Sequence, residues 1–243
     1  MRTANPALNS KAFGRVEGMV DSTVMTVQGA VLKTGFLTIL LGGAAVYTWH
    51  LAKTGGNAMP WLWGGMLGGL VLALITIFAP KASPFTSPLY AIAEGFFLGA
   101  LSAYYDARFP GLPIQAVCLT FCTLFGMLLL YTTGVIRATP AFRRGIMAAT
   151  CGIMLIYLLT WILGMFGVGI PYIHGSGLVG IGFSLFVVGI AAMNLVLDFH
   201  LIEQGANNRA PKYMEWYAAF GLLVTLVWLY LELLRLLSKL RSR

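Results

Sequence analysis

The chain has 243 residues, of which 58% are hydrophobic and only 10% are charged, and its formal net charge is +8. Lipid is the main solvent of a chain with this composition, so we expect one integral membrane domain and no soluble domain. The basic residues are spread along the chain rather than gathered with aromatic side chains on one face, which argues against a nucleic-acid partner.

Residues 1–33 precede the first predicted span and contain a helical pattern. Apolar residues recur at spacings of three and four between residues 13 and 31, with polar and charged residues between them. This pattern predicts an amphipathic helix that lies on the cytoplasmic leaflet or, alternatively, covers the bundle as a soluble cap. No cleavage pattern follows the first apolar segment, so no secretory signal is expected.

Seven apolar segments are long enough to cross a bilayer as helices. They are residues 34–52, 60–80, 86–106, 113–136, 141–167, 175–201 and 214–238. These segments make residues 34–238 a single all-α, seven-transmembrane-helix domain, and a basic tail follows at 239–243. Glycines recur four residues apart in several spans, which favours close packing seams inside the bundle over a dimer face.

The distribution of basic residues predicts the orientation of the chain. Ten Lys and Arg residues fall on the side of the N-terminus, against two in the loops of the opposite side. The positive-inside rule therefore places the N-terminus and the loop with Arg137 and Arg144 in the cytoplasm. The membrane is the cell membrane, or the inner membrane in a Gram-negative source. With seven spans, the four basic residues from Arg235 onward would fall on the opposite side, which the rule disfavours. Either the C-terminus lies outside against the rule, or the last segment does not cross completely and returns to the cytoplasmic side.

Three carboxylates are assigned to the interior of the spans: Glu94, Asp198 and Glu232. A carboxylate inside a bilayer is costly unless it is paired or hydrated, so each is a candidate functional residue. Asn194 precedes Asp198 by one helical turn, which favours an inward polar stripe over an acid that only reaches water at the helix end. Glu232 has Arg235 at i+3, which predicts a local ion pair near the membrane surface, to which Glu232 can snorkel.

Glu94 and Asp198 fall about 12 Å and about 6 Å from the same predicted boundary at the helical rise per residue, so we expect them to meet. Two carboxylates in one dry site would share a proton and titrate together near neutral pH. Their oxygens also suit a hard cation such as Ca²⁺ as transient ligands, although no firm metal site is predicted. The pair is thus predicted to be a proton-sensitive latch.

Enzyme chemistry and cofactors are not expected. Ser184 lies in a stretch that imitates an intramembrane serine protease, but His200 follows about 24 Å further along the same predicted helix, so the two cannot form a dyad. The three cysteines lie in apolar helices without His or carboxylate neighbours, which indicates packing rather than disulfides or metal. A retinal protein needs a lysine inside the last span, and Lys239 lies past its predicted end.

Several segments resemble the Bax inhibitor-1 (transmembrane Bax inhibitor motif) family. They are residues 5–9 (NPALN), 25–29 (MTVQG), 87–95 (SPLYAIAEG), 195–202 (LVLDFHLI) and the end of the last helix at 233–237 (LLRLL). The first three look like a bacterial branch of the family. The resemblance covers nearly the whole chain.

The resemblance implies a seven-helix bundle with a central last helix, acting as a pH-sensitive calcium leak or as a regulator of other membrane processes. It also implies a latch of two aspartates between the sixth and seventh helices. Asp198 matches the first aspartate, whereas the second falls at Thr225, which cannot ionise. The resemblance further implies a basic residue beside the latch as its counter-charge, and the corresponding sequence position falls near Lys81. Either Glu94 supplies the missing carboxylate, or proton gating and conduction have been lost.

We therefore expect a cation leak whose partners are the lipid bilayer and calcium or protons. The alternative is a non-conducting protein that binds another membrane protein, for instance a quality-control protease, through its glycine seams or its amphipathic N-terminal segment. Such a protein would tolerate the loss of both carboxylates.

Overall fold

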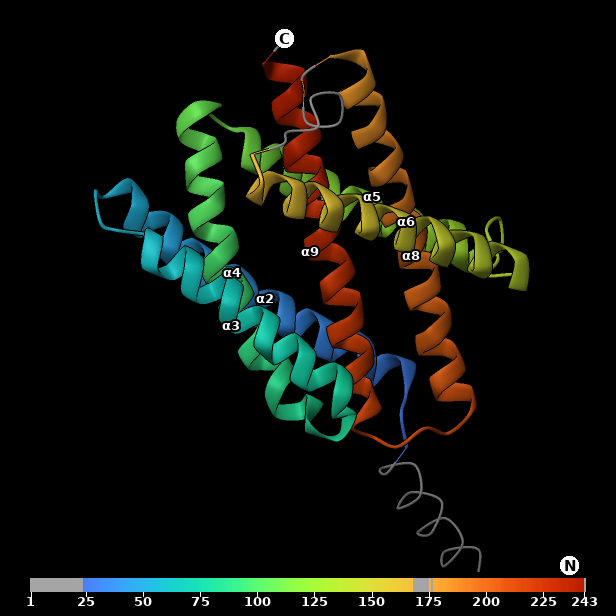
Figure 1. Ribbon diagram of the computed structural model, residues 1–243. Coiled ribbons are helices and arrows are strands. Elements are labelled where there is room, and N and C mark those ends of the chain that lie inside the picture. Colours follow the sequence, from blue (N-terminus) through green and yellow to red (C-terminus); the bar gives the residue numbers. More distant parts are fainter. Residues whose placement is uncertain (1–23, 168–174, 176, 243) are drawn as a thin grey trace, which may run out of the picture.

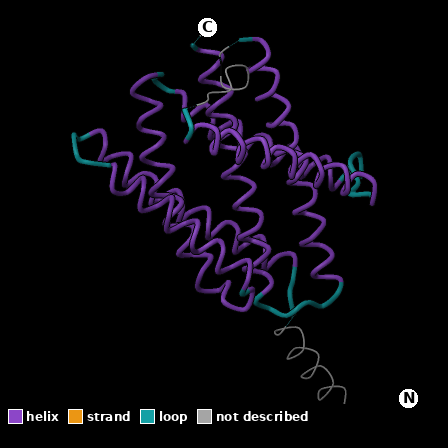
Figure 2. The backbone as a smooth tube through the Cα atoms, viewed as in Figure 1, coloured by secondary structure: helices purple, strands orange, loops and turns teal. Residues whose placement is uncertain are grey.

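The computed structural model describes residues 24–167, 175 and 177–242, which form a bundle of helices (Figure 1). The helices are α2 (Val27–Lys53), α3 (Met59–Phe78), α4 (Ser83–Arg108), α5 (Leu112–Thr132), α6 (Pro140–Met165), α8 (Leu178–Asn207) and α9 (Met214–Arg241), with a 3-10 turn, η2 (Pro80–Ala82), between α3 and α4. Short loops connect the helices, and the described residues include no strand (Figure 2).

Six of these helices are long and apolar enough to cross a membrane, and α4 is the exception. The seven predicted spans are therefore confirmed as helices, but only six as candidate spans by their composition. Much of the surface of α4 is buried, because the helix packs against α2, α3 and α9. A helix with protein around it needs few apolar side chains on its surface and can carry buried Ser83, Thr86, Ser87 and Ser102.

The last helix is the most enclosed of the candidate spans. In α9, 56% of the most apolar 18-residue stretch is buried, against 39% in α8 and at most 22% in the others. Leu222, Leu226 and Leu229 of α9 pack with Leu195 and Phe199 of α8 in the main core. In Figure 1, α2 and α9 begin and α8 ends at the lower end of the bundle, and α9 ends at its upper end.

The first helix begins earlier than the apolar pattern predicted. Thr26 is its N-cap, and its hydroxyl accepts a hydrogen bond from the Gly29 amide at 3.0 Å. Residues 27–33 are therefore the first turns of α2 rather than part of a separate segment. Val24 forms an isolated bridge with Pro211, so the described part of the predicted amphipathic helix is interrupted here. The rest of that helix, residues 13–23, lies outside the described residues.

Glycines bring α4 into backbone contact with α3 and α2. A Cβ atom added to Gly65 of α3 would lie 2.5 Å from the Ala93 carbonyl oxygen, and one added to Gly99 of α4 would lie 2.1 Å from the Ala45 carbonyl oxygen. No side chain fits at either distance. These glycines are therefore packing seams inside the bundle, as predicted.

Candidate functional site

Asp198 lies on α8 with its carboxyl group against α9. The side chain of Thr225 on α9 lies close to this carboxyl group, and the Thr225 hydroxyl donates to the Gly221 carbonyl at 3.3 Å. The carboxyl oxygen Oδ2 is buried and accepts no hydrogen bond from any described residue. A buried polar atom without a partner is rare because its desolvation is not compensated. Asp198 therefore has an oxygen available for a proton or a cation.

Helix geometry explains why Asp198 and Thr225 meet. Asp198 precedes the end of α8 by about 14 Å, and Thr225 follows the start of α9 by about 16 Å, at the helical rise per residue. The two helices are antiparallel neighbours, so these positions lie at similar heights above the lower end. The position that the family resemblance assigned to the second latch residue thus contacts Asp198, although Thr225 offers a hydroxyl in place of a second carboxylate.

Glu94 does not contact Asp198 in this structure. A Cβ atom on Gly69 of α3 would lie 2.7 Å from Glu94 Oε2, so the Glu94 side chain faces α3. One turn earlier, Tyr90 packs edge-on against Phe220 of α9, with ring centroids 5.0 Å apart. The predicted heights of the two carboxylates were similar, but α4 and α8 each pack against α9 and have little or no direct contact with each other. Depth along a helix does not specify the direction in which a side chain points.

Asn194 and Lys81, the remaining predicted members of the site, lie elsewhere. The Asn194 amide donates to the Thr150 hydroxyl on α6 and to the Ile190 carbonyl, both at 2.9 Å, so it connects α8 to α6. Lys81 is exposed in η2, and the ion pairs found among the described residues do not include it. The expected counter-charge to the latch is therefore absent from this arrangement.

Glu232 forms a buried network with α6. Arg235 Nη1 lies 2.9 Å from Glu232 Oε1, which confirms the predicted ion pair. The Tyr157 hydroxyl on α6 also donates to Oε1 at 2.9 Å and accepts from Arg235 at 2.7 Å. The expectation that Glu232 snorkels to water was wrong, because the residue is only 1% exposed and α6 covers it. Charge neutralisation by Arg235 makes this burial tolerable.

The basic residues at the end of α9 are also engaged by the protein. Lys239 is 6% exposed and donates to the Gly180 carbonyl at 3.0 Å and to the Ser184 hydroxyl at 2.9 Å. Arg241 donates to the Pro110 carbonyl at 2.7 Å and to Gln115 Oε1 at 3.1 Å. The basic tail predicted at residues 239–243 therefore begins within α9. These bonds give a structural reason for basic residues at the end where the positive-inside rule disfavours them.

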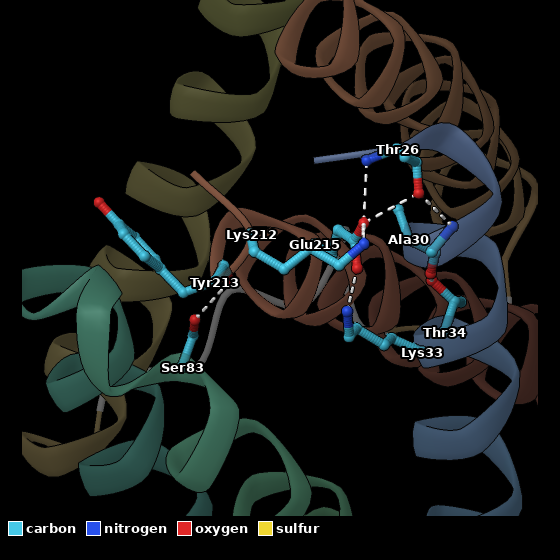
Figure 3. Close-up of polar contacts among 9 residues, drawn as sticks. Thr26, Ala30, Lys33, Thr34, Ser83, Lys212, Tyr213 and Glu215 are labelled. Atoms are coloured by element: carbon cyan, nitrogen blue, oxygen red, sulfur yellow. Dashed lines mark hydrogen bonds and ion pairs between the residues drawn. The ribbon is translucent and has the colours of Figure 1, made fainter. Parts of the chain in front are cut away.

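Glu215, which the sequence analysis overlooked, is the most extensively bonded carboxylate among the described residues (Figure 3). It is fully buried at the start of α9. Its Oε1 accepts from the amide and the hydroxyl of Thr26, both at 2.9 Å, and lies 2.9 Å from Lys212 Nζ. Its Oε2 pairs with Lys33 of α2. We call Thr26, Lys33, Lys212 and Glu215 the Glu215 cluster.

Gly29 makes the Glu215 cluster sterically feasible. A Cβ atom on Gly29 would lie 2.2 Å from Glu215 Oε1, so any other residue there would displace the carboxylate. The sequence pattern does not reveal this cluster, because the helix dipole alone explains an acid at the start of a helix and both lysines fit the charge pattern expected of cytoplasmic segments. The motif at residues 25–29 contains both Thr26 and Gly29 and could have indicated a site at this position. It does not identify the carboxylate that these residues surround.

A comparison with known protein families covers both regions. The model of a family described as Bax inhibitor 1 like matches residues 5–242, nearly the whole chain. This match includes the Asp198–Thr225 contact and the Glu215 cluster. Comparisons with curated proteins and with solved structures found no match.

Proposed function

Because the chain belongs to the Bax inhibitor 1 like family, we propose that it is a membrane protein through which cations, including calcium, leak slowly and in a pH-dependent way. The six helices that can span a bilayer support the membrane location. The observation that carries the proposal is the buried Asp198 Oδ2 without a hydrogen-bond donor among the described residues. In the proposed orientation, the N-terminus faces the cytoplasm.

A proton or a cation would satisfy the free oxygen of Asp198. Calcium takes six to eight oxygen ligands, which include carboxylates, carbonyls and waters. Asp198 and Thr225 would supply only a part of such a shell, and no group of three or more His, Cys, Asp or Glu side chains that could hold a metal is found in the described part of the chain. Incomplete coordination suits conduction, because an ion must also leave its site.

Competition between protons and cations would produce the pH dependence. When the Asp198 carboxyl group is protonated, it carries no charge and is a poor ligand for Ca²⁺. When it is ionised, it attracts a cation, and the Thr225 hydroxyl can stabilise the anion. The ion flux should therefore change over the pH range in which Asp198 titrates, without a second carboxylate.

A second function, binding of another membrane protein without conduction, is favoured by the residue at position 225. The family resemblance implies an aspartate there, and Thr225 can neither ionise nor share a proton with Asp198. A chain that had lost this proton exchange could keep the fold and act through its surface. Its partner would be a membrane protein, such as a quality-control protease.

Calcium uptake by liposomes separates the two functions. The purified chain would be reconstituted into liposomes that contain a calcium-sensitive dye, with liposomes lacking protein as the control. The leak proposal predicts uptake above the control that falls several-fold in Asp198→Asn. If the wild-type protein takes up no more calcium than the control at any pH between 5 and 8, the leak is excluded and the partner-binding function remains.

A further inference from the structure

A large cleft opens between α2 and α5, and α8 and α9 form its floor. Its volume is about 980 Å³, at the upper end of the range for small-molecule sites. Leu222 and Leu226 of α9 lie at the bottom, between a wall from α2 and a wall from α5. All four helices are candidate membrane spans, so the cleft lies at the height of the bilayer.

The walls of the cleft are mainly apolar and exposed. Val31 and Ile39 of α2 face the space from one side, and Phe125 of α5 faces it from the other. Gly35 of α2 widens the cleft, since a Cβ atom there would meet nothing within 4 Å. In a bilayer such a space does not stay empty, and its apolar walls suit an acyl chain rather than water.

One end of the cleft is polar and carries both signs of charge. Arg137, from the loop between α5 and α6, is exposed there, and none of the ion pairs found among the described residues involves it. Its Nε donates to the Gly134 carbonyl at 3.4 Å, which leaves the other guanidinium donors for a ligand. Glu203 lines the same end from α8 and accepts a hydrogen bond from the Tyr131 hydroxyl.

We propose that this cleft binds a zwitterionic phospholipid with an amine headgroup, such as phosphatidylethanolamine. Its acyl chain would lie between α2 and α5, its phosphate would bind Arg137, and its ammonium group would bind Glu203. The planar guanidinium matches phosphate oxygens with two parallel hydrogen bonds. An anionic lipid such as phosphatidylglycerol would bind Arg137 equally well, but it has no positive group to offer Glu203, so the carboxylate selects against it.

Native mass spectrometry of the purified chain tests which lipid headgroup the cleft prefers. The protein would be presented with equal amounts of phosphatidylethanolamine and phosphatidylglycerol with identical acyl chains. We expect the wild type to retain phosphatidylethanolamine several-fold better. Arg137→Gln should lower retention of both lipids, and Glu203→Gln should shift the preference toward phosphatidylglycerol. A ratio that is unchanged by Glu203→Gln would overturn the assignment of the amine headgroup.

Substitution of two glycines of α2 tests whether the lipid binds in this cleft. Gly35→Phe fills the cleft, whereas Gly43→Phe adds the same side chain at an exposed position that also meets nothing within 4 Å and does not line the cleft. Gly35→Phe should lose most of the retained lipid, and Gly43→Phe should keep it. Equal retention by the two variants, or equal loss, would contradict a lipid site between α2 and α5. Elution of both variants at the wild-type volume in gel filtration shows that they are folded.

Discussion

The backbone N–H of Thr26 and the Glu215 carboxylate lie 2.9 Å apart, although 189 residues separate them along the chain. This contact joins the first turns of α2 and α9 at the lower end of the bundle. A buried carboxylate is stable only when its partners compensate for the lost water, and here two lysines and Thr26 do so. The Glu215 cluster therefore holds the first described helix against the central one.

Gly29→Ala should destabilise the protein, because the new methyl group occupies the position of the Glu215 carboxylate. If the disturbed ion cluster lowers the free energy of unfolding by about 2 kcal/mol, the melting temperature should fall by about 4–8 °C in a chain of this size. Gly43→Ala is the matched control, since Gly43 is in the same helix and a Cβ atom there meets nothing within 4 Å. Thermal unfolding followed by tryptophan fluorescence measures both variants. Equal melting temperatures would show that the cluster contributes little.

Glu232→Gln should lower stability but leave the ion flux within a factor of about two of wild type, a change worth well under 1 kcal/mol. The reason is that Glu232 neutralises Arg235 within a closed network with Tyr157, apart from Asp198. Tyr157→Phe is the comparison, because it removes a hydroxyl from this network without changing its charge. A collapse of calcium uptake in Glu232→Gln would instead move the ion site to the end of α9.

The orientation of the chain remains a prediction from its basic loops. In a variant without the native cysteines, a cysteine at Ala138 should not react with an impermeant thiol reagent added to intact cells, since this loop is expected in the cytoplasm. Labelling after the cells are opened is the control for reactivity. Labelling of intact cells would reverse the orientation.

Apolar length predicted where the helices lie, because crossing a bilayer requires about 20 apolar residues whatever the packing. The contact between Asp198 and position 225 was also foreseeable, since it follows from the family resemblance. The direction of the Glu94 side chain could not be predicted, because the rotation of α4 about its own axis decides whether that side chain faces α3 or α8. Glu215 was missed for a related reason, since its partners come from a segment at the other end of the chain.

Thr225→Asp should make the pH dependence of the flux steeper. A second carboxyl group against Asp198 would create two acids in one buried site, and such a pair holds one proton between them over a range of pH. Thr225→Val is the control, because it removes the hydroxyl and adds no charge. Calcium uptake by liposomes would be compared from pH 5 to pH 8. Identical profiles for the two variants would show that residue 225 does not influence proton binding at Asp198.

A comparison of Asp198→Asn with Glu94→Gln in the same liposome assay tests most directly whether Asp198 binds the proton and the ion. Each variant removes one carboxylate from the bundle, but only Asp198 carries the buried oxygen that accepts no hydrogen bond from the described residues. We expect Asp198→Asn to abolish the pH dependence of calcium uptake and Glu94→Gln to retain it. Loss of the pH dependence in Glu94→Gln, or its persistence in Asp198→Asn, would contradict the assignment of Asp198 as the proton- and ion-binding residue.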